Sequence, residues 1–255
     1  MTAPVAIVTG GAKGIGRSIA IELASKGFDL AIVDRLEEGE AQDTLGGVKA
    51  LGRQAVFIHH DLADVGNAAN VVAKAIAALG RIDCHVNNAG VQSPVRGDIL
   101  DLELSHFDVV LDINLRGTFF LTQEVARWMA ANEDQATYRS IHFVTSTNAV
   151  IPAPTRSAYC LSKTGLAMAA QVYALRMAPH GVHVFEIRPG TVRTDMTKDV
   201  VAERDAKIAS GAVPIARWGE PEDIGKVVAT LASGAMPFMT GTALFVDGGG
   251  HIRPN

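Results

Sequence analysis

The amino-acid sequence predicts an α/β fold, in which a doubly wound sheet of about seven parallel strands carries helices on both faces. Two observations predict it. Short apolar runs alternate with longer Ala- and Leu-rich segments of helical spacing almost from end to end, and a glycine-rich turn follows the first apolar run. Such alternation is typical of right-handed βαβ crossovers, which place helices on both sides of a parallel sheet. Because the chain contains no linker-like tract and no internal repeat, we expect one domain spanning residues 1–255.

Seven compact apolar runs are the strand candidates, since strands of a parallel sheet are buried on both faces. They occupy residues 5–8, 30–33, 56–59, 82–86, 141–144, 183–187 and 243–246. The helical segments occupy residues 14–26, 38–51, 66–79, 105–130, 157–179 and 221–232. The long, polar stretch 191–217 breaks this rhythm, and its length predicts short helices that form a substrate lid over a cleft. The polar residues 132–139 are expected to be a surface loop at the edge of the sheet opposite that cleft.

Composition excludes several classes of function. The formal net charge is −4 and no basic run is present, so we expect no nucleic-acid partner and no anionic membrane surface. No apolar run approaches the roughly 18 residues that span a membrane, and the first residues run straight into a predicted strand, which leaves no room for a signal peptide. Two cysteines are expected to be reduced thiols of a cytoplasmic protein. The eight histidines have no metal-site spacing, so we expect no catalytic metal.

The glycine-rich turn, Thr-Gly-Gly-Ala-Lys-Gly-Ile-Gly at residues 9–16, joins the first predicted strand to the first predicted helix. Glycines permit a tight turn and let backbone amides approach a pyrophosphate, and the helix N-terminus adds partial positive charge. Glycine also serves ordinary turns, but this placement between strand and helix favours dinucleotide binding. The expected cofactor contacts in the turn are Gly10, Lys13, Gly14, Ile15 and Gly16.

Asp34 and Arg35, at the end of the second predicted strand, bear on the choice of nicotinamide cofactor. A carboxylate at this place can accept hydrogen bonds from both hydroxyls of an adenosine ribose and would repel a 2′-phosphate. Lys13 and Arg35 could instead attract that phosphate, so NADP is the alternative cofactor. A carboxylate facing a dianion is costly in a partly buried site, and the sequence therefore favours NAD.

The most specific pattern for catalysis is the pair of Tyr159 and Lys163, which share one face of a predicted helix. A free tyrosine has a pKa near 10, too high for a base at neutral pH. A nearby ammonium group favours the phenolate, so Tyr159 is a candidate general acid/base. Ser146, at the end of the fifth predicted strand, could hydrogen-bond the substrate oxygen and stabilise developing charge. Asn114 lies inside a predicted helix against its propensity and so requires a tertiary reason.

These residues, in this order along essentially the whole chain, resemble the short-chain dehydrogenase/reductase family. The motifs that carry the resemblance are the turn at 9–16, Asn-Asn-Ala-Gly at 87–90, Asn114, Ser146 and the Tyr-x-x-x-Lys pattern at 159–163. The resemblance implies a Rossmann fold and hydride transfer between a nicotinamide cofactor and a carbonyl or alcohol. It implies that Tyr159 is the acid/base, that Lys163 lowers its pKa and binds the nicotinamide ribose, that Ser146 orients the substrate, and that Asn114 holds a water in a proton relay.

Further cofactor contacts come from the same resemblance. Asp61 and Leu62 match positions that contact adenine, Asn88, Ala89 and Gly90 match the cofactor channel, and Pro189, Gly190, Val192 and Thr194 match the loop that holds the carboxamide. Members of this length are usually tetramers, with the last strand and the helix that carries Tyr159 at the subunit contacts, so the resemblance implies a homotetramer.

The sequence leaves the substrate open. We expect a small secondary alcohol or ketone, namely a polyol, a sugar or a hydroxy acid. The chain also resembles 3-oxoacyl-[acyl-carrier-protein] reductases, an alternative that predicts NADPH and a basic patch for an acidic carrier protein. Asp34 argues against NADPH, and the basic residues of the stretch 191–217 are offset by acidic ones. A non-catalytic dinucleotide sensor is the hypothesis from another class, and the intact Tyr159–Lys163 pair argues against it.

Overall fold

The computed structural model describes residues 2–133 and 137–252 and contains one parallel sheet of seven strands. The strand order is β3-β2-β1-β4-β5-β6-β7, and every adjacent pair is parallel. The bounds are β1 Val5–Thr9, β2 Asp29–Asp34, β3 Ala55–His59, β4 Cys84–Asn87, β5 Arg139–Val144, β6 Val182–Pro189 and β7 Thr242–Val246. The order reverses between β1 and β4, which is the point where doubly wound sheets open a crevice for ligands. The predicted Rossmann fold is confirmed.

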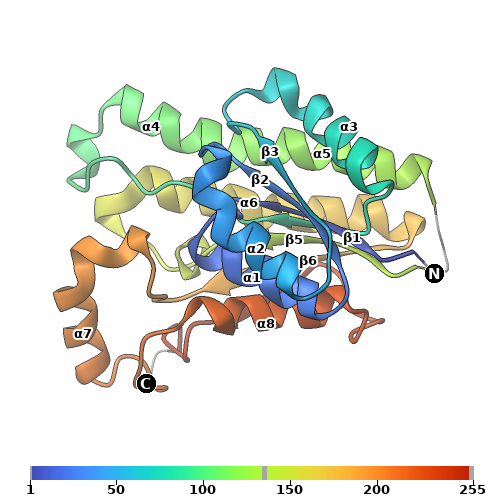
Figure 1. Ribbon diagram of the computed structural model, residues 1–255. Coiled ribbons are helices and arrows are strands. Elements are labelled where there is room, and N and C mark those ends of the chain that lie inside the picture. The colour runs from blue at the N-terminus through green and yellow to red at the C-terminus, as the bar shows by residue number, and fades with distance from the viewer. Residues whose placement is uncertain (1, 134–136, 253–255) are drawn as a thin grey trace.

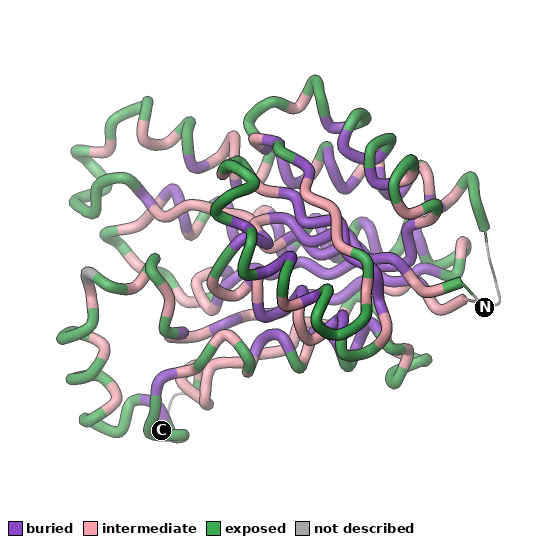
Figure 2. The backbone as a smooth tube through the Cα atoms, viewed as in Figure 1, coloured by how far each residue is buried: buried purple, intermediate pink, exposed green. Residues whose placement is uncertain are grey.

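Two layers of helices enclose the sheet (Figure 1). One layer consists of α1 Gly14–Ser25, α2 Gln42–Ala50 and α8 Pro221–Ala232. The other consists of α3 Ala68–Leu79, α5 Thr118–Ala131 and α6 Ser157–Met177, with α4 Leu104–Leu111 extending from it. Alternate residues of each strand point into opposite layers. In β1, for example, Ala6 and Val8 pack towards α1 and α8, whereas Ile7 packs towards α3 and α5. Figure 2 shows the resulting buried sheet between helices whose outer faces are exposed.

The structure differs in detail from the single helix predicted at residues 105–130. A π-helical segment, Asp112–Gly117, separates α4 from α5. Its last residue, Gly117, packs so closely on the backbone of Leu62 that an added Cβ would lie 2.0 Å from the carbonyl oxygen. Tertiary packing therefore decides the helix geometry here, and π-helical turns of this kind are frequent at functional sites.

The segment predicted to be a lid contains a 3-10 helix, Asp195–Val200, followed by α7 Val201–Ala209, and its role as a lid stays a prediction. The loop predicted at 132–139 lies partly outside the described residues. Its last residue, Arg139, differs from the expected surface position: it starts β5, is buried, and donates hydrogen bonds to the carbonyl oxygens of Met129 and His180. No helix in the described part of the chain combines the length and apolar character needed to cross a membrane.

Candidate active site

A cleft of about 950 Å³ lies where strands β1 to β6 end. All the predicted cofactor contacts line it, together with Ser146, Tyr159 and Lys163. These residues come from loops that are far apart in the sequence, and the parallel sheet brings them to one edge. Asn114 is the one predicted site residue that does not line this cleft.

The geometry of the glycine-rich turn fits a bound pyrophosphate, because the backbone there is too tightly folded to accept side chains at its glycine positions. Gly10 has a φ of 64°, which L side chains rarely adopt, and a Cβ on Gly16 would lie 2.0 Å from the Gly10 carbonyl oxygen. The Asn88 side chain, from the loop after β4, donates to the carbonyl oxygens of Thr9 and Gly10 at 3.0 and 3.1 Å. The two loops are thus fixed to each other at the N-terminus of α1, where a phosphate is favoured.

Asp34 lies beside this turn and is only partly buried. Its carboxylate accepts hydrogen bonds from the backbone amides of Ala12 at 3.1 Å and Leu36 at 3.2 Å. These bonds fix the carboxylate at the end of β2 and leave it acceptor capacity for ribose hydroxyls. The exposed Lys13, by contrast, lies 3.7 Å from Glu40 in an ion pair, so its charge already has a carboxylate partner.

Tyr159 is buried in the first turns of α6 and lies near Ser146. Burial raises the pKa of the Tyr159 hydroxyl, and two smaller effects oppose it, namely the hydrogen bond with Ser146 and the positive charge of Arg156. The Ser146 hydroxyl also accepts the backbone amide of Asn148 at 3.0 Å. A proton can therefore stay on the tyrosine at neutral pH in the protein alone, which is the state a general acid needs.

Lys163 lies one helical turn after Tyr159, as predicted, and is also buried. Its Nζ donates to the carbonyl oxygen of Val144 at 3.1 Å and lies 5.7 Å from the centre of the Tyr159 ring. Burial lowers the pKa of Lys163 to about 8. At pH 7 its charge therefore persists, and the role implied for it, favouring the Tyr159 phenolate, stays a prediction.

Asn114 is fully buried in the π-helical segment. Its Oδ1 accepts the backbone amide of Val91 at 2.7 Å, and its Nδ2 donates to the Val91 carbonyl oxygen at 2.9 Å and to Ser162 at 3.1 Å. The side chain thus holds the loop after β4 against α6, which is the tertiary reason for an asparagine in this helix. The role that the resemblance implies for Asn114, holding a water in a proton relay, stays a prediction.

Two residues that the sequence did not single out, Gln92 and Trp218, also line the cleft. Gln92 reaches across it, with its Nε2 3.6 Å from the sulfur of Met196 in the lid. Trp218 follows the lid, is buried, and donates its indole N–H to Asp205 of α7 at 2.7 Å. In the sequence, Trp218 could have been singled out because it is a large apolar residue directly after the polar stretch 191–217. The segment 191–217 is thus in contact with the loop after β4 through Gln92, and its helix α7 is anchored by Trp218.

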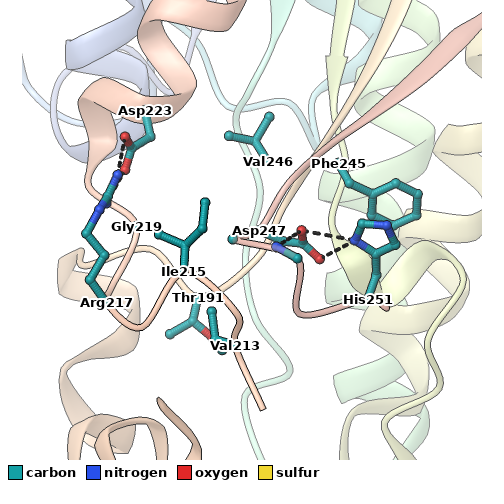
Figure 3. A pocket seen from close by; sticks show the side chains of 12 residues that line it. Thr191, Val213, Ile215, Arg217, Gly219, Asp223, Phe245, Val246, Asp247 and His251 are labelled. Carbon is teal, nitrogen blue, oxygen red and sulfur yellow. Dashed lines mark hydrogen bonds and ion pairs between the residues drawn. The ribbon is translucent and has the colours of Figure 1, made fainter. Parts of the chain in front are cut away.

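A second cavity of about 340 Å³ is lined mainly by residues 213–219 and 245–251, together with Thr191 and Asp223 (Figure 3). Its ionisable groups pair with one another: Arg217 with Asp223 at 2.7 Å, and His251 with Asp247 at 2.9 Å. The Arg217 guanidinium lowers the pKa of Asp223 to about 2. Because these charges already have partners, we assign ligand binding to the larger cleft. Within residues 2–133 and 137–252, no group of three or more metal-ligating side chains could hold a metal ion.

Comparison with known proteins gives matches over nearly the whole chain. A family model described as enoyl-(acyl carrier protein) reductase matches residues 10–251. The solved structure of a 3-oxoacyl-[acyl-carrier protein] reductase from Brucella melitensis in complex with NAD is 45% identical, covers 100% of both chains, and superposes with a TM-score of 0.96. L-Rhamnose 1-dehydrogenase (NAD(P)(+)) of a Sphingomonas species is 33% identical over 97% of this chain and 96% of its own length. The 2-dehydro-3-deoxy-D-gluconate 5-dehydrogenase of Dickeya dadantii is 32% identical over 98% and 96%.

Proposed function

Because this chain belongs to the short-chain dehydrogenase/reductase family and is an NAD(P)-dependent dehydrogenase acting on CH–OH groups, we propose that it interconverts a small secondary alcohol and its ketone with NAD(H). The observation that carries the proposal is that Ser146, Tyr159 and Lys163 line the same cleft as the glycine-rich turn and Asp34. The substrate is a polyol, a sugar or a hydroxy acid. Two of the relatives named above act on a sugar and a sugar acid by their names, which supports this class.

The residues would act as follows. The glycine turn and Asn88 hold the pyrophosphate, Asp34 holds the adenosine ribose, and the loop from Pro189 to Thr194 holds the nicotinamide. A bound nicotinamide supplies or accepts the hydride at the substrate carbon. Ser146 hydrogen-bonds the substrate oxygen and Tyr159 gives or takes its proton, while the charge of Lys163 stabilises the tyrosine in its deprotonated state. The lid excludes water when it closes over the substrate.

Asp34 is expected to make the protein prefer NADH over NADPH by about tenfold or more, because a 2′-phosphate would face its carboxylate. Fluorescence titration of the purified protein with both cofactors measures the ratio. Asp34→Asn removes the charge and keeps an oxygen acceptor, so it should reduce the preference for NADH over NADPH. Asp34→Ala, which also loses the amide contacts of Ala12 and Leu36, should narrow it at least as far.

The same titration tests the alternative function, an NADPH-dependent 3-oxoacyl-[acyl-carrier-protein] reductase, which the 45% identity to the Brucella melitensis protein favours. Tighter NADPH binding by the unmodified protein, together with faster reduction of a 3-oxoacyl thioester than oxidation of any small alcohol, would contradict the NAD-dependent alcohol dehydrogenase. The alternative would then take its place. The structure of that relative holds NAD, which supports placing the NAD-dependent alcohol dehydrogenase before the NADPH-dependent reductase.

We further propose that the protein is a cytoplasmic homotetramer. Helix α6 exposes an apolar stripe of Leu161, Met168, Val172 and Leu175, which are 52–82% exposed and share one face. Strand β7 is the outermost of the sheet and pairs with β6 alone among the described strands. Contiguous exposed apolar surface marks protein–protein contacts. Analytical ultracentrifugation should give the mass of four chains, and a monomer or dimer at micromolar concentration would refute this assembly.

A further inference from the structure

Two cations, Lys13 of the glycine-rich turn and Arg17 of α1, line the cleft together with Asp34. The backbone amide of Ala12 donates to the Asp34 carboxylate at 3.1 Å, so the next residue, Lys13, lies at the end of the cleft that we assign to the adenosine ribose. NADPH differs from NADH only by a 2′-phosphate on that ribose. A lysine without a partner at this place would attract the phosphate, and its charge therefore bears on which cofactor is bound.

Both cations have carboxylate partners. The Nζ of Lys13 lies 3.7 Å from Glu40, and the Nη2 of Arg17 lies 3.2 Å from Asp43. The two carboxylates come from the segment 38–43, which forms a 3-10 turn and the start of α2, and neither of them lines the cleft. They therefore act on the cations from outside the cleft wall, as counterions and not as ligands of the ribose.

Buried neighbours fix the position of Glu40 near Lys13. Ala41 and Thr44, which follow Glu40, are fully buried. The Thr44 hydroxyl donates to the carbonyl oxygen of Ala12 at 2.8 Å, which ties α2 to the glycine-rich turn one residue before Lys13. Glu40 is thus held beside the lysine by the packing of its own helical segment, although its side chain is 49% exposed.

We propose that Glu40 is a second determinant of cofactor choice: by pairing with Lys13, it withholds the lysine from a 2′-phosphate and so favours NADH over NADPH. This inference rests on the proposed use of NAD(H) and adds a residue to Asp34. The two carboxylates act in different ways. Asp34 repels the phosphate directly, whereas Glu40 neutralises the cation that would attract it. Because the Lys13–Glu40 pair is exposed and screened by salt, the effect of Glu40 is the smaller one.

Fluorescence titration of Glu40→Gln with NADPH and with NADH measures the effect. The substitution keeps the length of the side chain and removes its charge, so Lys13 is released. The Kd for NADPH should fall about three- to fivefold at low salt, the upper range for an exposed ion pair. The Kd for NADH, which carries no 2′-phosphate, should change less than about twofold. In about 1 M salt, where the Debye length is about 3 Å, the gain in NADPH affinity should disappear.

Two further variants test whether Glu40 acts through Lys13. Glu38→Gln makes the same change of charge in the same 3-10 turn, and Glu38 forms no ion pair within the described part of the chain, so the Kd for NADPH should change less than about twofold. In a Lys13→Met background, Glu40→Gln should no longer tighten NADPH binding. Arg35, the other cation that could attract the phosphate, is the same in all variants and contributes equally to each comparison.

The outcomes separate this inference from the function beneath it. An unchanged Kd for NADPH in Glu40→Gln, equal changes for the two cofactors, or a gain that persists without Lys13 would overturn the role of Glu40 and leave the NAD-dependent dehydrogenase intact. An equal gain in Glu38→Gln would overturn it as well, because the ion pair would then have no special part. If the unmodified protein binds NADPH more tightly than NADH, the proposed cofactor preference fails, and the change in the NADPH Kd on removing the Glu40 charge still decides the role of Glu40.

Discussion

Tyr159→Phe is expected to lower kcat by about 10²- to 10⁴-fold, the usual contribution of a general acid or base. The substitution removes one oxygen atom, and the ring that packs under Arg156 and near Lys163 stays in place. Binding of NADH, measured by fluorescence titration, should remain nearly unchanged because the phosphate and adenosine contacts lie in other loops. A fall in kcat without a matching loss of cofactor affinity would place the tyrosine in the chemical step.

Tyr173→Phe provides the matched control. Tyr173 lies on the same helix, is buried, and donates its hydroxyl to the carbonyl oxygen of Phe119 at 2.9 Å, away from the cleft. The same atomic change there should cost about 1 kcal/mol of stability, the net value of one hydrogen bond, and leave kcat close to normal. Near-normal turnover in Tyr159→Phe, or equal losses in both variants, would show that another group exchanges the proton.

The fold could be predicted from the sequence because each buried strand reads as a compact apolar run. Six of the seven predicted runs fall inside the observed strands, and the fourth began two residues early, at Ile82 instead of Cys84. The predicted helix at 38–51 begins instead with a 3-10 turn, Glu38–Ala41. The π-helical segment at Asn114 could not be predicted, since it depends on contacts with Leu62 and Val91 from other parts of the chain.

Some features of the candidate site could likewise be predicted from the sequence, and others could not. The turn at 9–16 and the Tyr159–Lys163 spacing are local patterns whose chemistry can be recognised in the sequence, and the structure places them in one cleft. The burial of Lys163, which decides its pKa, is instead a property of the packed structure.

Lys163→Met is expected to remove most activity and yet stabilise the cofactor-free protein at pH 7. Lowering the pKa of a lysine from 10.5 to about 8 by burial corresponds to about 3 kcal/mol of unfavourable free energy at neutral pH. Methionine has a similar length and carries no charge to desolvate. It leaves the Val144 carbonyl oxygen without its donor, which costs about 1 kcal/mol. The net gain in the free energy of unfolding should be about 2 kcal/mol.

The dependence of stability on pH identifies the cause of that gain. Between pH 8 and about 10, the unfolded chain keeps the Lys163 proton and the folded protein releases it, so the wild-type free energy of unfolding should rise with pH relative to the variant. Below pH 8 both states of the wild type are protonated, and the difference should be constant and in favour of methionine. Urea unfolding across pH 6–10 measures both curves. A variant that is less stable than wild type at pH 7, or a difference independent of pH up to 10, would mean that the ammonium group is not penalised by burial. If the gain is observed, the burial of this ammonium group lowers the stability of the cofactor-free protein.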